Sequence, residues 1–297
     1  MKIHVLGSSA GGGLPQWNCG GEYSVRARAG DSSVPPRSQP SIAVSADGVR
    51  WSILNASPDI RDQLARFRGL HPRPGTRDIP LDTIVLSNAD LDHTLGLLVM
   101  RESLPYRVVS TRWVRDAILD HNAAWRLMEA AWGVAKLDEP FALDREGRLE
   151  AKLFPVSGKV PPYLQGLVPN HAESTAGVRI TDHESGRRLV YAAGIKSYDS
   201  ATLAELEAAD CRFVDGTFFT ANELLAMRPG AVDAHAMGHL PISGKESSLP
   251  VLAKLPGRSL YIHMNNTNPV LDAHSKAADA VRAAGVEIAM DGMELEL

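Results

Sequence analysis

The sequence predicts an α/β domain in which layers of helices cover β-sheets. Two observations support this prediction. First, the early strand patterns follow one another closely across a tight turn. Second, the later strand patterns alternate with helical patterns. The chain has 297 residues, of which 44% are hydrophobic, so it can bury a large core. It contains no internal repeat, low-complexity tract or linker, and we therefore expect one domain over residues 1–297.

The chain begins with a strand pattern, Lys2–Leu6, that leads into a glycine-rich loop, Gly7–Gly13. This loop lacks the Gly-Lys-Ser/Thr ending of a phosphate-binding loop, so we expect its glycines to let the backbone pass close to a functional site. Residues 18–39 are rich in Gly, Ser, Arg and Pro and have no periodicity, which predicts a long surface loop. Three arginines of this loop are expected to face solvent, with the alternative that one of them meets an acidic substrate: Arg26, Arg28 and Arg37.

The remaining elements follow from hydrophobic periodicity and turn residues. Short apolar runs predict strands at Ser41–Ser45, Trp51–Asn55, Asp82–Ser87, Leu149–Pro155, Ala176–Thr181, Arg188–Ala192, Arg212–Asp215 and Ser259–His263. Helical patterns cover Ser57–Phe67, Thr94–Met100, Arg112–Leu127, Tyr198–Ala209 and Ser275–Ala284.

Composition narrows the classes of partner. The formal net charge of −4 provides no basic surface for nucleic acid. No apolar run approaches the roughly 18 residues that a membrane-spanning helix needs, and the first residues match a strand better than a signal peptide. Two cysteines cannot form a disulfide framework, which favours a reducing compartment, so we expect a cytoplasmic protein.

The densest group of chemically active residues directly follows the predicted strand Asp82–Ser87. This group consists of Asn88, Asp90, Asp92 and His93. Carboxylates at this density repel one another if they turn inward, and a metal ion supplies the missing positive charge. The alternative is a solvated acidic turn in which Asp92 caps the following helix.

Three later segments favour the metal. Asp215 directly follows an apolar strand, His239 lies beside a glycine, and His263 ends another strand before an amide-rich turn that contains Asn266. A single histidine at a strand end is more often structural than a ligand. Three such segments together with the acidic group favour a metal site at the ends of the strands.

The order of these motifs resembles the metallo-β-lactamase superfamily, whose signature is His-x-His-x-Asp-His after a strand, followed by a distant His, an Asp and a final His. The four signature positions hold Asn88, Asp90, Asp92 and His93, and the later positions hold Asp215 and His263. The resemblance implies a four-layer αββα sandwich. Within this superfamily, the whole chain resembles the PqqB family of pyrroloquinoline quinone (PQQ) biosynthesis. The segments that carry this resemblance are Leu6–Cys19, Leu54–Arg61, Pro155–Pro161, Met237–His239 and His263–Val270.

The departures from the superfamily pattern imply one metal ion. The first metal site of the hydrolases needs three imidazoles, but Asn88 and Asp90 stand at two of these positions, and His171 is a weak candidate for the third. The second site keeps two imidazoles and one carboxylate as ligands: Asp92, His93 and His263. This set is typical of non-haem Fe(II) oxygenases, so we expect one divalent metal, with Fe(II) favoured and Zn(II) compatible.

The resemblance also implies catalytic roles for the remaining positions of the motif. Asp215 is expected to reach the metal or to hold a metal-bound water, and Asp90 to orient His93 or His263. His239 is expected to act as a general acid or base, or to donate a hydrogen bond to bound oxygen or substrate. The alternative for His239 is a buried structural histidine.

The resemblance to the PqqB family implies an iron- and O2-dependent hydroxylation of the tyrosine ring in an intermediate built from cross-linked Glu and Tyr. The implied partners are this small PQQ precursor, O2 as co-substrate and other proteins of the pathway. We expect Asn88, Asn266 and Arg61 to bind the substrate, and Lys159 is a further candidate for its carboxylates. Two alternatives are a carrier that transports PQQ or its precursor, and a metal-dependent hydrolase.

PqqB proteins often carry Cys-x-Cys-x-x-Cys after Trp-Asn, which resembles a structural zinc knuckle. The corresponding positions here hold Cys19, Gly21 and Ser24. A tetrahedral zinc site needs four ligands, and Cys211 is expected to lie in a strand. We therefore predict no structural zinc.

Overall fold

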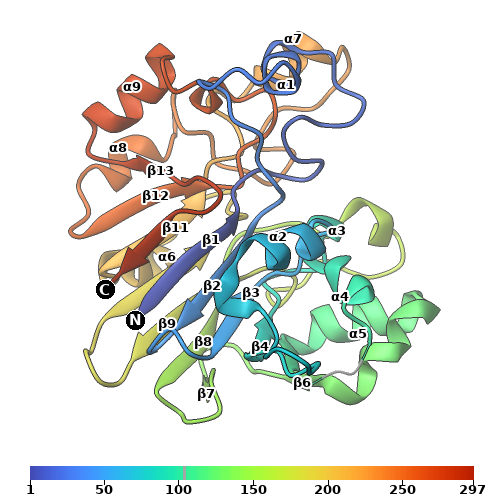
Figure 1. Cartoon of the computed structure of the whole chain (residues 1–297). Helices are drawn as coiled ribbons and strands as arrows, with labels where there is room; N and C mark the ends of the chain where they lie inside the picture. Colours follow the sequence, from blue (N-terminus) through green and yellow to red (C-terminus); the bar gives the residue numbers. More distant parts are fainter. Residues whose placement is uncertain (103–104) are drawn as a thin grey trace.

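The computed structural model describes residues 1–102 and 105–297 and shows two seven-stranded β-sheets packed face to face (Figure 1). The first sheet has the order β14 (Glu294–Glu296), β1 (Lys2–Gly7), β2 (Ser41–Ser45), β3 (Trp51–Leu54), β4 (Leu81–Val85), β5 (Arg107–Ser110), β6 (Trp132–Val134). The second has the order β13 (Glu287–Ile288), β12 (Arg258–Ile262), β11 (Cys211–Asp215), β10 (Arg188–Ala192), β9 (Ala176–Asp182), β8 (Leu149–Pro155), β7 (Pro140–Ala142). The two chain termini belong to neighbouring strands of the first sheet, the edge strand β14 and the adjacent strand β1.

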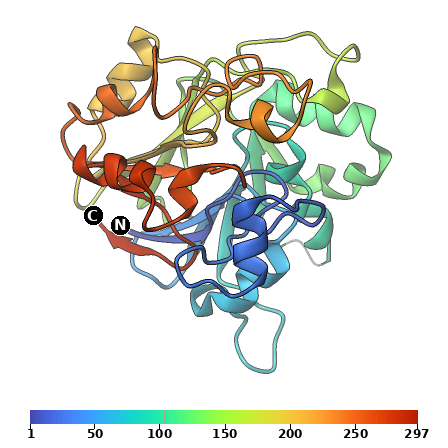
Figure 2. The same cartoon turned by 90° about the horizontal axis from the view of Figure 1, so that it is seen from above.

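Helices cover the outer faces of the sheets (Figure 2). The α-helices are α1 (Glu22–Arg28), α2 (Ile60–Arg66), α3 (Leu91–Thr94), α4 (Gly96–Val99), α5 (Arg112–His121), α6 (Ser200–Glu207), α7 (Glu223–Met227), α8 (Leu249–Leu252) and α9 (Lys276–Ala283). Short 3-10 helices are η1 (Arg68–Leu70), η2 (Ala123–Ala131), η3 (Pro162–Leu164) and η4 (Pro269–Leu271).

Three apolar clusters hold the layers together. The central one lies between the sheets, where Leu54 and Val85 of the first sheet join Tyr191 and Phe213 of the second. The second cluster packs α2, α4 and α5 on the first sheet, and the third packs α6, α8 and α9 on the second sheet. Burial of this apolar surface is the main driving force for the layered arrangement. The predicted αββα sandwich is therefore confirmed.

Strand direction brings the loops of the site to the same end of the two sheets. Strands β3 to β6 are parallel, and so are β10 to β13. Antiparallel pairing of β1 with β2 and of β2 with β3 gives β1 the direction of β3. The carboxyl ends of β1, β3 and β4 therefore lie on one side of the first sheet, and those of β10, β11 and β12 lie on one side of the facing sheet.

The predicted strands are all present, with ends that differ by at most two residues. The helix predicted at Thr94–Met100 is instead two short helices, α3 and α4, and α3 already begins at Leu91. Asp92 therefore lies in the first turn of α3 and does not cap it. The helix predicted at Arg112–Leu127 ends at His121, and η2 follows it. Cys211 lies in β11, as expected.

The prediction of a surface loop at residues 18–39 is wrong in part. The segment contains α1, and it buries Ser24, Ala27 and Val34. Their burial shows that the segment packs on the fold, since a solvated loop would leave these side chains exposed. The only regular element is one short helix, which explains why no periodicity was visible in the sequence.

The prediction that the arginines of this segment face solvent is wrong for Arg37 and Arg26. Arg37 is 6% exposed and donates hydrogen bonds to the carbonyl of Ala289 and to Ser8. Arg26 forms ion pairs with Asp31 at 2.8 Å and, across the fold, with Asp272 at 2.7 Å. Buried carbonyl and carboxylate groups need donors, and the guanidinium group supplies several at once. Arg28 is exposed but donates to the carbonyl of Cys19 at 2.6 Å.

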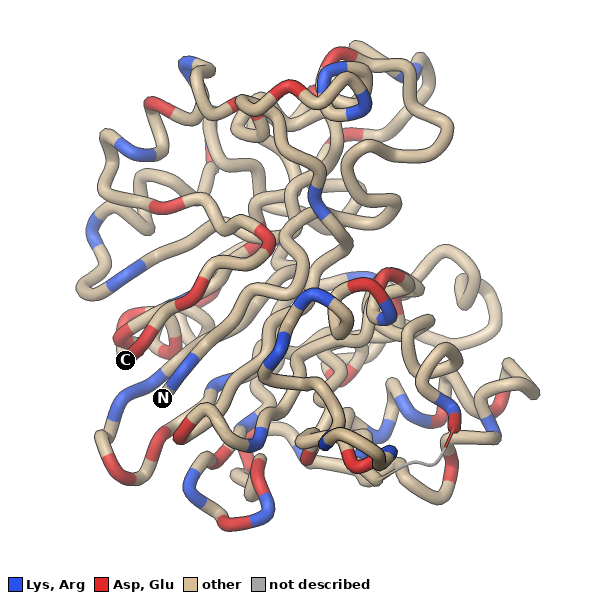
Figure 3. The backbone as a smooth tube through the Cα atoms, in the orientation of Figure 1, with Lys and Arg blue, Asp and Glu red and all other residues tan. Residues whose placement is uncertain are grey.

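Charged residues of both signs are interspersed along the backbone, in keeping with the small net charge (Figure 3). Among the residues that the structure describes, none of the helices has the length and apolar character needed to cross a membrane.

The glycine-rich loop after β1 is fixed beside the end of β12. The amide of Ala10 donates to the carbonyl of Met264 at 2.8 Å, and the amide of Met264 donates to the carbonyl of Ser8 at 3.1 Å. The carboxylate of Asp291 accepts four hydrogen bonds of 2.6–2.9 Å from the amides and hydroxyls of Ser8 and Ser38. This carboxylate therefore joins the start of the loop to the segment that precedes β2.

We expect Asp291→Ala to lower the free energy of unfolding by about 2 kcal/mol, because four buried or half-buried donors lose a charged acceptor. Denaturant unfolding measures this change. The control is Asp279→Ala, whose exposed carboxylate pairs only with Arg282 on the surface of α9. Its effect should stay within about 0.5 kcal/mol. Equal effects of the two substitutions would contradict the role assigned to Asp291.

Candidate metal centre

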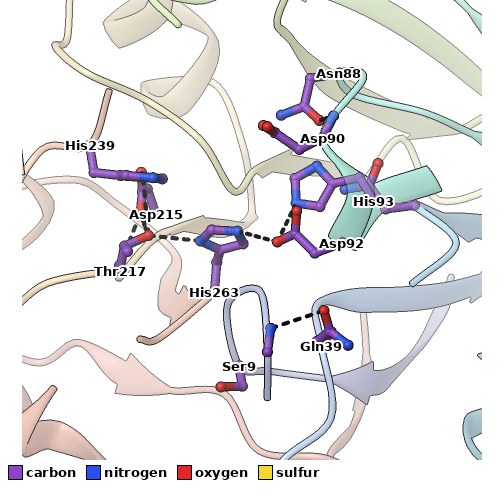
Figure 4. A network of polar contacts seen from close by, with 12 residues as sticks. Ser9, Gln39, Asn88, Asp90, Asp92, His93, Asp215, Thr217, His239 and His263 are labelled. Atoms are coloured by element: carbon purple, nitrogen blue, oxygen red, sulfur yellow. Dashed lines mark hydrogen bonds and ion pairs between the residues drawn. The ribbon is translucent and has the colours of Figure 1, made fainter. Parts of the chain in front are cut away.

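The predicted metal ligands meet between the ends of the two sheets (Figure 4). Asp92 and His93 lie in α3, directly after β4, and His263 directly follows β12. Their ligand atoms all lie within 4.8 Å of one another. The Oδ2 atom of Asp92 is 3.1 Å from Nε2 of His263 and 3.8 Å from Nε2 of His93. The structure thus brings together the three residues that the sequence predicted.

His93 presents an unprotonated nitrogen to this centre. Its Nδ1 atom is 3.3 Å from the hydroxyl of Ser87, whose amide and hydroxyl lie 2.9 and 3.1 Å from Oδ1 of Asn55. The hydroxyl proton of Ser87 points to Asn55, so the Ser87 oxygen accepts the proton of His93 Nδ1. The Nε2 atom of His93 is then a bare acceptor, and it is buried without a hydrogen-bond partner among the described residues. A buried lone pair of this kind fits a metal ligand.

His263 is held by the same arrangement. Its Nδ1 atom is 2.7 Å from the hydroxyl of Thr217, and that hydroxyl is 2.5 Å from Oδ1 of Asp215. Thr217 donates its single proton to the carboxylate and accepts from Nδ1 of His263, which directs Nε2 toward Asp92. The backbone of His263 has a φ of 65°, an uncommon conformation for a non-glycine residue that is concentrated at functional sites.

Asp215 orients its neighbours. Its two oxygens accept from the amides of Ile195 and Thr217, from the hydroxyl of Thr217, and from Nδ1 of His239 at 2.6 Å. Four donors occupy the carboxylate, so the geometry favours a positioning role over direct contact with a metal. The proton on Nδ1 of His239 points to Asp215, which leaves Nε2 of His239 available as a proton acceptor.

Burial and charge set the protonation states of the ligands. Burial lowers the pKa of His93 to about 4, so this imidazole is neutral at pH 7. Burial alone would lower the pKa of His263, but its hydrogen bond with Asp92 and the charges of Asp92 and Asp215 outweigh burial and raise it. Burial would likewise raise the pKa of Asp92, but the neighbouring imidazoles of His93 and His263, the second through a hydrogen bond, hold it well below its usual range. Asp92 is therefore ionised.

Asp90 does not orient either imidazole. Ser87 and Thr217 do so instead, and the Asp90 carboxylate forms no hydrogen bond with His93 or His263 in the part of the chain that the structure describes. Burial, followed by the charge of Asp92, raises the pKa of Asp90 to about 6. The Asp90 carboxyl group is thus ionised at pH 7 in most molecules but takes up a proton more readily than an exposed aspartate.

The other predicted residues lie at different distances from the centre. Asn88 is buried beside it and accepts from the amide of Asp90 at 3.0 Å. His171 lies in an exposed loop, where its ring accepts from the amide of Glu173, so it supplies no third imidazole. The side chain of Arg61 is 86% exposed on α2 and lies 3.6 Å from Asp62.

A cavity of about 900 Å³ opens next to the ligands. Its lining residues include Gly11, Gln16, Asn265, Asn266 and Arg228. A Cβ atom at Gly11 would lie 3.4 Å from the carboxyl group of Asp92, so the glycine-rich loop forms a boundary shared by the cavity and the metal centre. Asn266 donates to Gln16 across this boundary at 2.8 Å.

Comparison with known proteins identifies the family. A family model described as the beta-lactamase superfamily domain matches residues 50–264. The coenzyme PQQ synthesis protein B of Methylobacterium nodulans is 40% identical to this chain, and that of Pseudomonas paraeruginosa is also 40% identical, each over the full length of both chains. The chain belongs to the PqqB family.

Solved structures agree with this assignment. The crystal structure of Zn(2+)-bound PqqB from Methylobacterium extorquens matches the chain with a TM-score of 0.94 and 38% identity, and covers all of both chains. A diphosphatase of the PhnP family matches with a TM-score of 0.68 and 20% identity, over 100% of this chain and 97% of its own. This second likeness shows the shared fold alone. The sequence resemblance to the metallo-β-lactamase superfamily and to PqqB is thus confirmed.

The positions at which the resemblance implies a cysteine motif hold Cys19, Gly21 and Ser24, of which one carries a thiol. The Sγ atom of Cys19 lies 3.8 Å from Sδ of Met227. A Cβ atom at Gly21 would lie 2.1 Å from Cε of Met227, so this methionine fills the space that a side chain at position 21 would take. Ser24 is buried, and its hydroxyl has no partner among the described residues. Met227 and the contacts of Arg26 and Arg28 hold the segment.

Three residues of the centre were missed by the sequence argument: Asn55, Ser87 and Thr217. Each is a short polar residue at or just after the end of a strand. That position was the available signal, because Thr217 stands two residues after Asp215 and Ser87 directly precedes the acidic group.

We expect His263→Ala to lose the metal while the fold is retained, because it removes one of three ligands. The measurement is metal content per chain after loading with Fe(II) or Zn(II), with circular dichroism as the test of folding. The control is His171→Ala, which removes an exposed imidazole and should keep one ion per chain. Full metal retention by His263→Ala would exclude His263 as a ligand.

We expect Thr217→Val to weaken metal affinity about 10- to 100-fold, because it leaves the volume nearly unchanged but removes the hydroxyl that holds His263. Competition with a chelator of known affinity measures this change. Thr217→Ser keeps the hydroxyl and should remain close to the native affinity. If the Thr217→Val and Thr217→Ser variants bind metal equally well, the hydroxyl does not orient the imidazole.

Proposed function

We propose that this PqqB-family chain acts in PQQ biosynthesis as a mononuclear, Fe(II)- and O2-dependent hydroxylase of the tyrosine ring in a Glu–Tyr-derived intermediate. The observation that carries the proposal is the set of two imidazoles and one carboxylate, His93, His263 and Asp92. This set is typical of non-haem Fe(II) oxygenases. The names of the curated relatives, which refer to coenzyme PQQ synthesis, support the pathway.

The donor set fits a hard or borderline divalent ion. The bare, buried Nε2 atom of His93 has no protein partner in the described chain, and the ionised carboxylate of Asp92 lies beside it. When bound by these two residues and His263, Fe(II) supplies the reducing power that O2 activation requires. Insertion of one oxygen atom into a ring C–H bond sends the second oxygen to water and requires a two-electron reductant.

His239 is the proton acceptor in this proposal. Asp215 holds the imidazole with its proton on Nδ1, so Nε2 can take the proton of the phenol group. A phenolate ring is richer in electrons than a phenol and reacts more readily with an oxidant. Asn88 beside the centre and Asn266 on the cavity wall are the proposed polar contacts for the substrate.

A two-metal hydrolase is less well supported by this geometry. Asn88 and Asp90 replace two imidazoles of the first hydrolytic site, and the carboxylate of Asp215 is occupied by four donors. Such a clamp needs ligands for both ions. A carrier of PQQ or its precursor would use the same cavity, so binding and turnover must be measured separately.

We expect one Fe(II) per chain and substrate-dependent O2 uptake when anaerobically purified, Fe(II)-loaded protein meets a tyrosine- or catechol-type amino acid with a reductant. Mass spectrometry with ¹⁸O2 should show one labelled oxygen atom in the product. The Zn(II)-loaded protein is the matched control and should take up no O2, because Zn(II) has no redox chemistry. Tight binding of PQQ without O2 uptake under either metal would favour the carrier.

A further inference from the structure

The side chain of Lys159 packs against the turn that carries His239. It is half-buried and runs across Gly238, where a Cβ atom would lie 3.3 Å from both Cγ and Cδ of the lysine. Gly238 has a φ of 88°, a conformation that glycine adopts without strain. The methylene groups of Lys159 thus pack on the backbone next to the proposed proton acceptor.

The backbone around Lys159 is tied to the metal centre. A Cβ atom at Gly158 would lie 2.1 Å from the hydroxyl of Thr175, and Thr175 forms a β-bridge with Asn88. On the other side, the amide of Lys196 donates to the carbonyl of Ser157 at 2.9 Å. These contacts fix the backbone of Lys159 relative to Asn88. The backbone of a lysine on a surface loop without such contacts would not be fixed in this way.

The ammonium group of Lys159 forms no hydrogen bond or ion pair with any residue that the structure describes, while the residue as a whole is half-buried. Burial lowers the pKa of Lys159, and the one charge that raises it again belongs to Asp90. The ammonium group therefore lies within electrostatic reach of a carboxyl group that stands beside the ligands (Figure 4). A lysine whose methylene groups are packed and whose ammonium group has no protein partner can bind an incoming anion.

The other cations near the site are placed differently. Arg61 is largely exposed and pairs with Asp62, and Arg228 is exposed at the cavity wall. Each can be solvated without a ligand. Lys159 combines a fixed backbone, partial burial and a missing partner.

We infer that Lys159 binds a carboxylate of the substrate at the edge of the metal centre. This inference rests on the proposed function and names the substrate class, an aromatic ring attached to a carboxylate by a short chain. The centre holds the carboxyl groups of Asp90, Asp92 and Asp215, which would repel an acidic substrate. Lys159 offsets this repulsion on the side of His239 and so orients the ring toward the metal ligands.

The test uses a matched pair of probes, 3-(4-hydroxyphenyl)propanoate and its uncharged amide, titrated into Zn(II)-loaded full-length protein by calorimetry. The native protein should bind the acid more tightly than the amide. Lys159→Gln should weaken binding of the acid about 10-fold and leave the amide unchanged, because one charge-assisted hydrogen bond is lost. Lys159→Arg should retain most of the preference for the acid.

Lys196→Gln is the control, since Lys196 is exposed on a neighbouring segment and should keep the native preference. Both variants should retain one zinc ion per chain. The inference fails if the native protein does not bind the acid, if it binds acid and amide equally, or if both glutamine variants lose the preference alike. Because zinc supports no turnover, a Lys159-dependent preference without O2 uptake by the iron form would refute the hydroxylase and leave this carboxylate site standing.

Discussion

The metal centre depends on two hydroxyl groups that donate their protons to groups other than the histidines. Ser87 donates to Asn55 and Thr217 donates to Asp215, so each hydroxyl oxygen is left to accept from Nδ1 of one histidine. A neutral imidazole has one donor and one acceptor, and fixing the donor fixes the acceptor. The fold therefore directs the Nε2 atoms of both imidazoles toward Asp92 before any ion binds, that of His93 without a hydrogen-bond partner among the described residues and that of His263 within 3.1 Å of the carboxylate.

Sheet pairing brings these groups together. Asn55 and Ser87 follow the neighbouring parallel strands β3 and β4, and the amide of Asn55 also reaches Tyr191 of the opposite sheet at 3.4 Å. Thr217 and His263 follow the neighbouring parallel strands β11 and β12. A slip of one residue in either register would turn these side chains away from the site. The apolar cluster between the sheets thus fixes the polar geometry at their edge.

The sequence predicted the layers and the ligands because both leave local patterns. Apolar runs bounded by turns located every strand that carries the site, and Asp92, His93 and His263 stood at recognisable motif positions. The orienting residues could not be assigned in the same way, since a serine or threonine after a strand has many roles and only tertiary contacts select one. Arg37 was misjudged for a related reason: its carbonyl partner, Ala289, lies 252 residues away in the chain.

The distribution of charge supports one ion in place of two. A second ion would need imidazole donors where the chain has Asn88 and Asp90. Asp215 stands at the later Asp position of the superfamily signature, and here protein donors already surround it. The amide of Asn88 and the occupied carboxylate of Asp215 thus leave a second ion with fewer donors than the two-metal hydrolases provide. The space beside the remaining ion is left to a substrate, and Lys159 gives that space a preference for an acidic one.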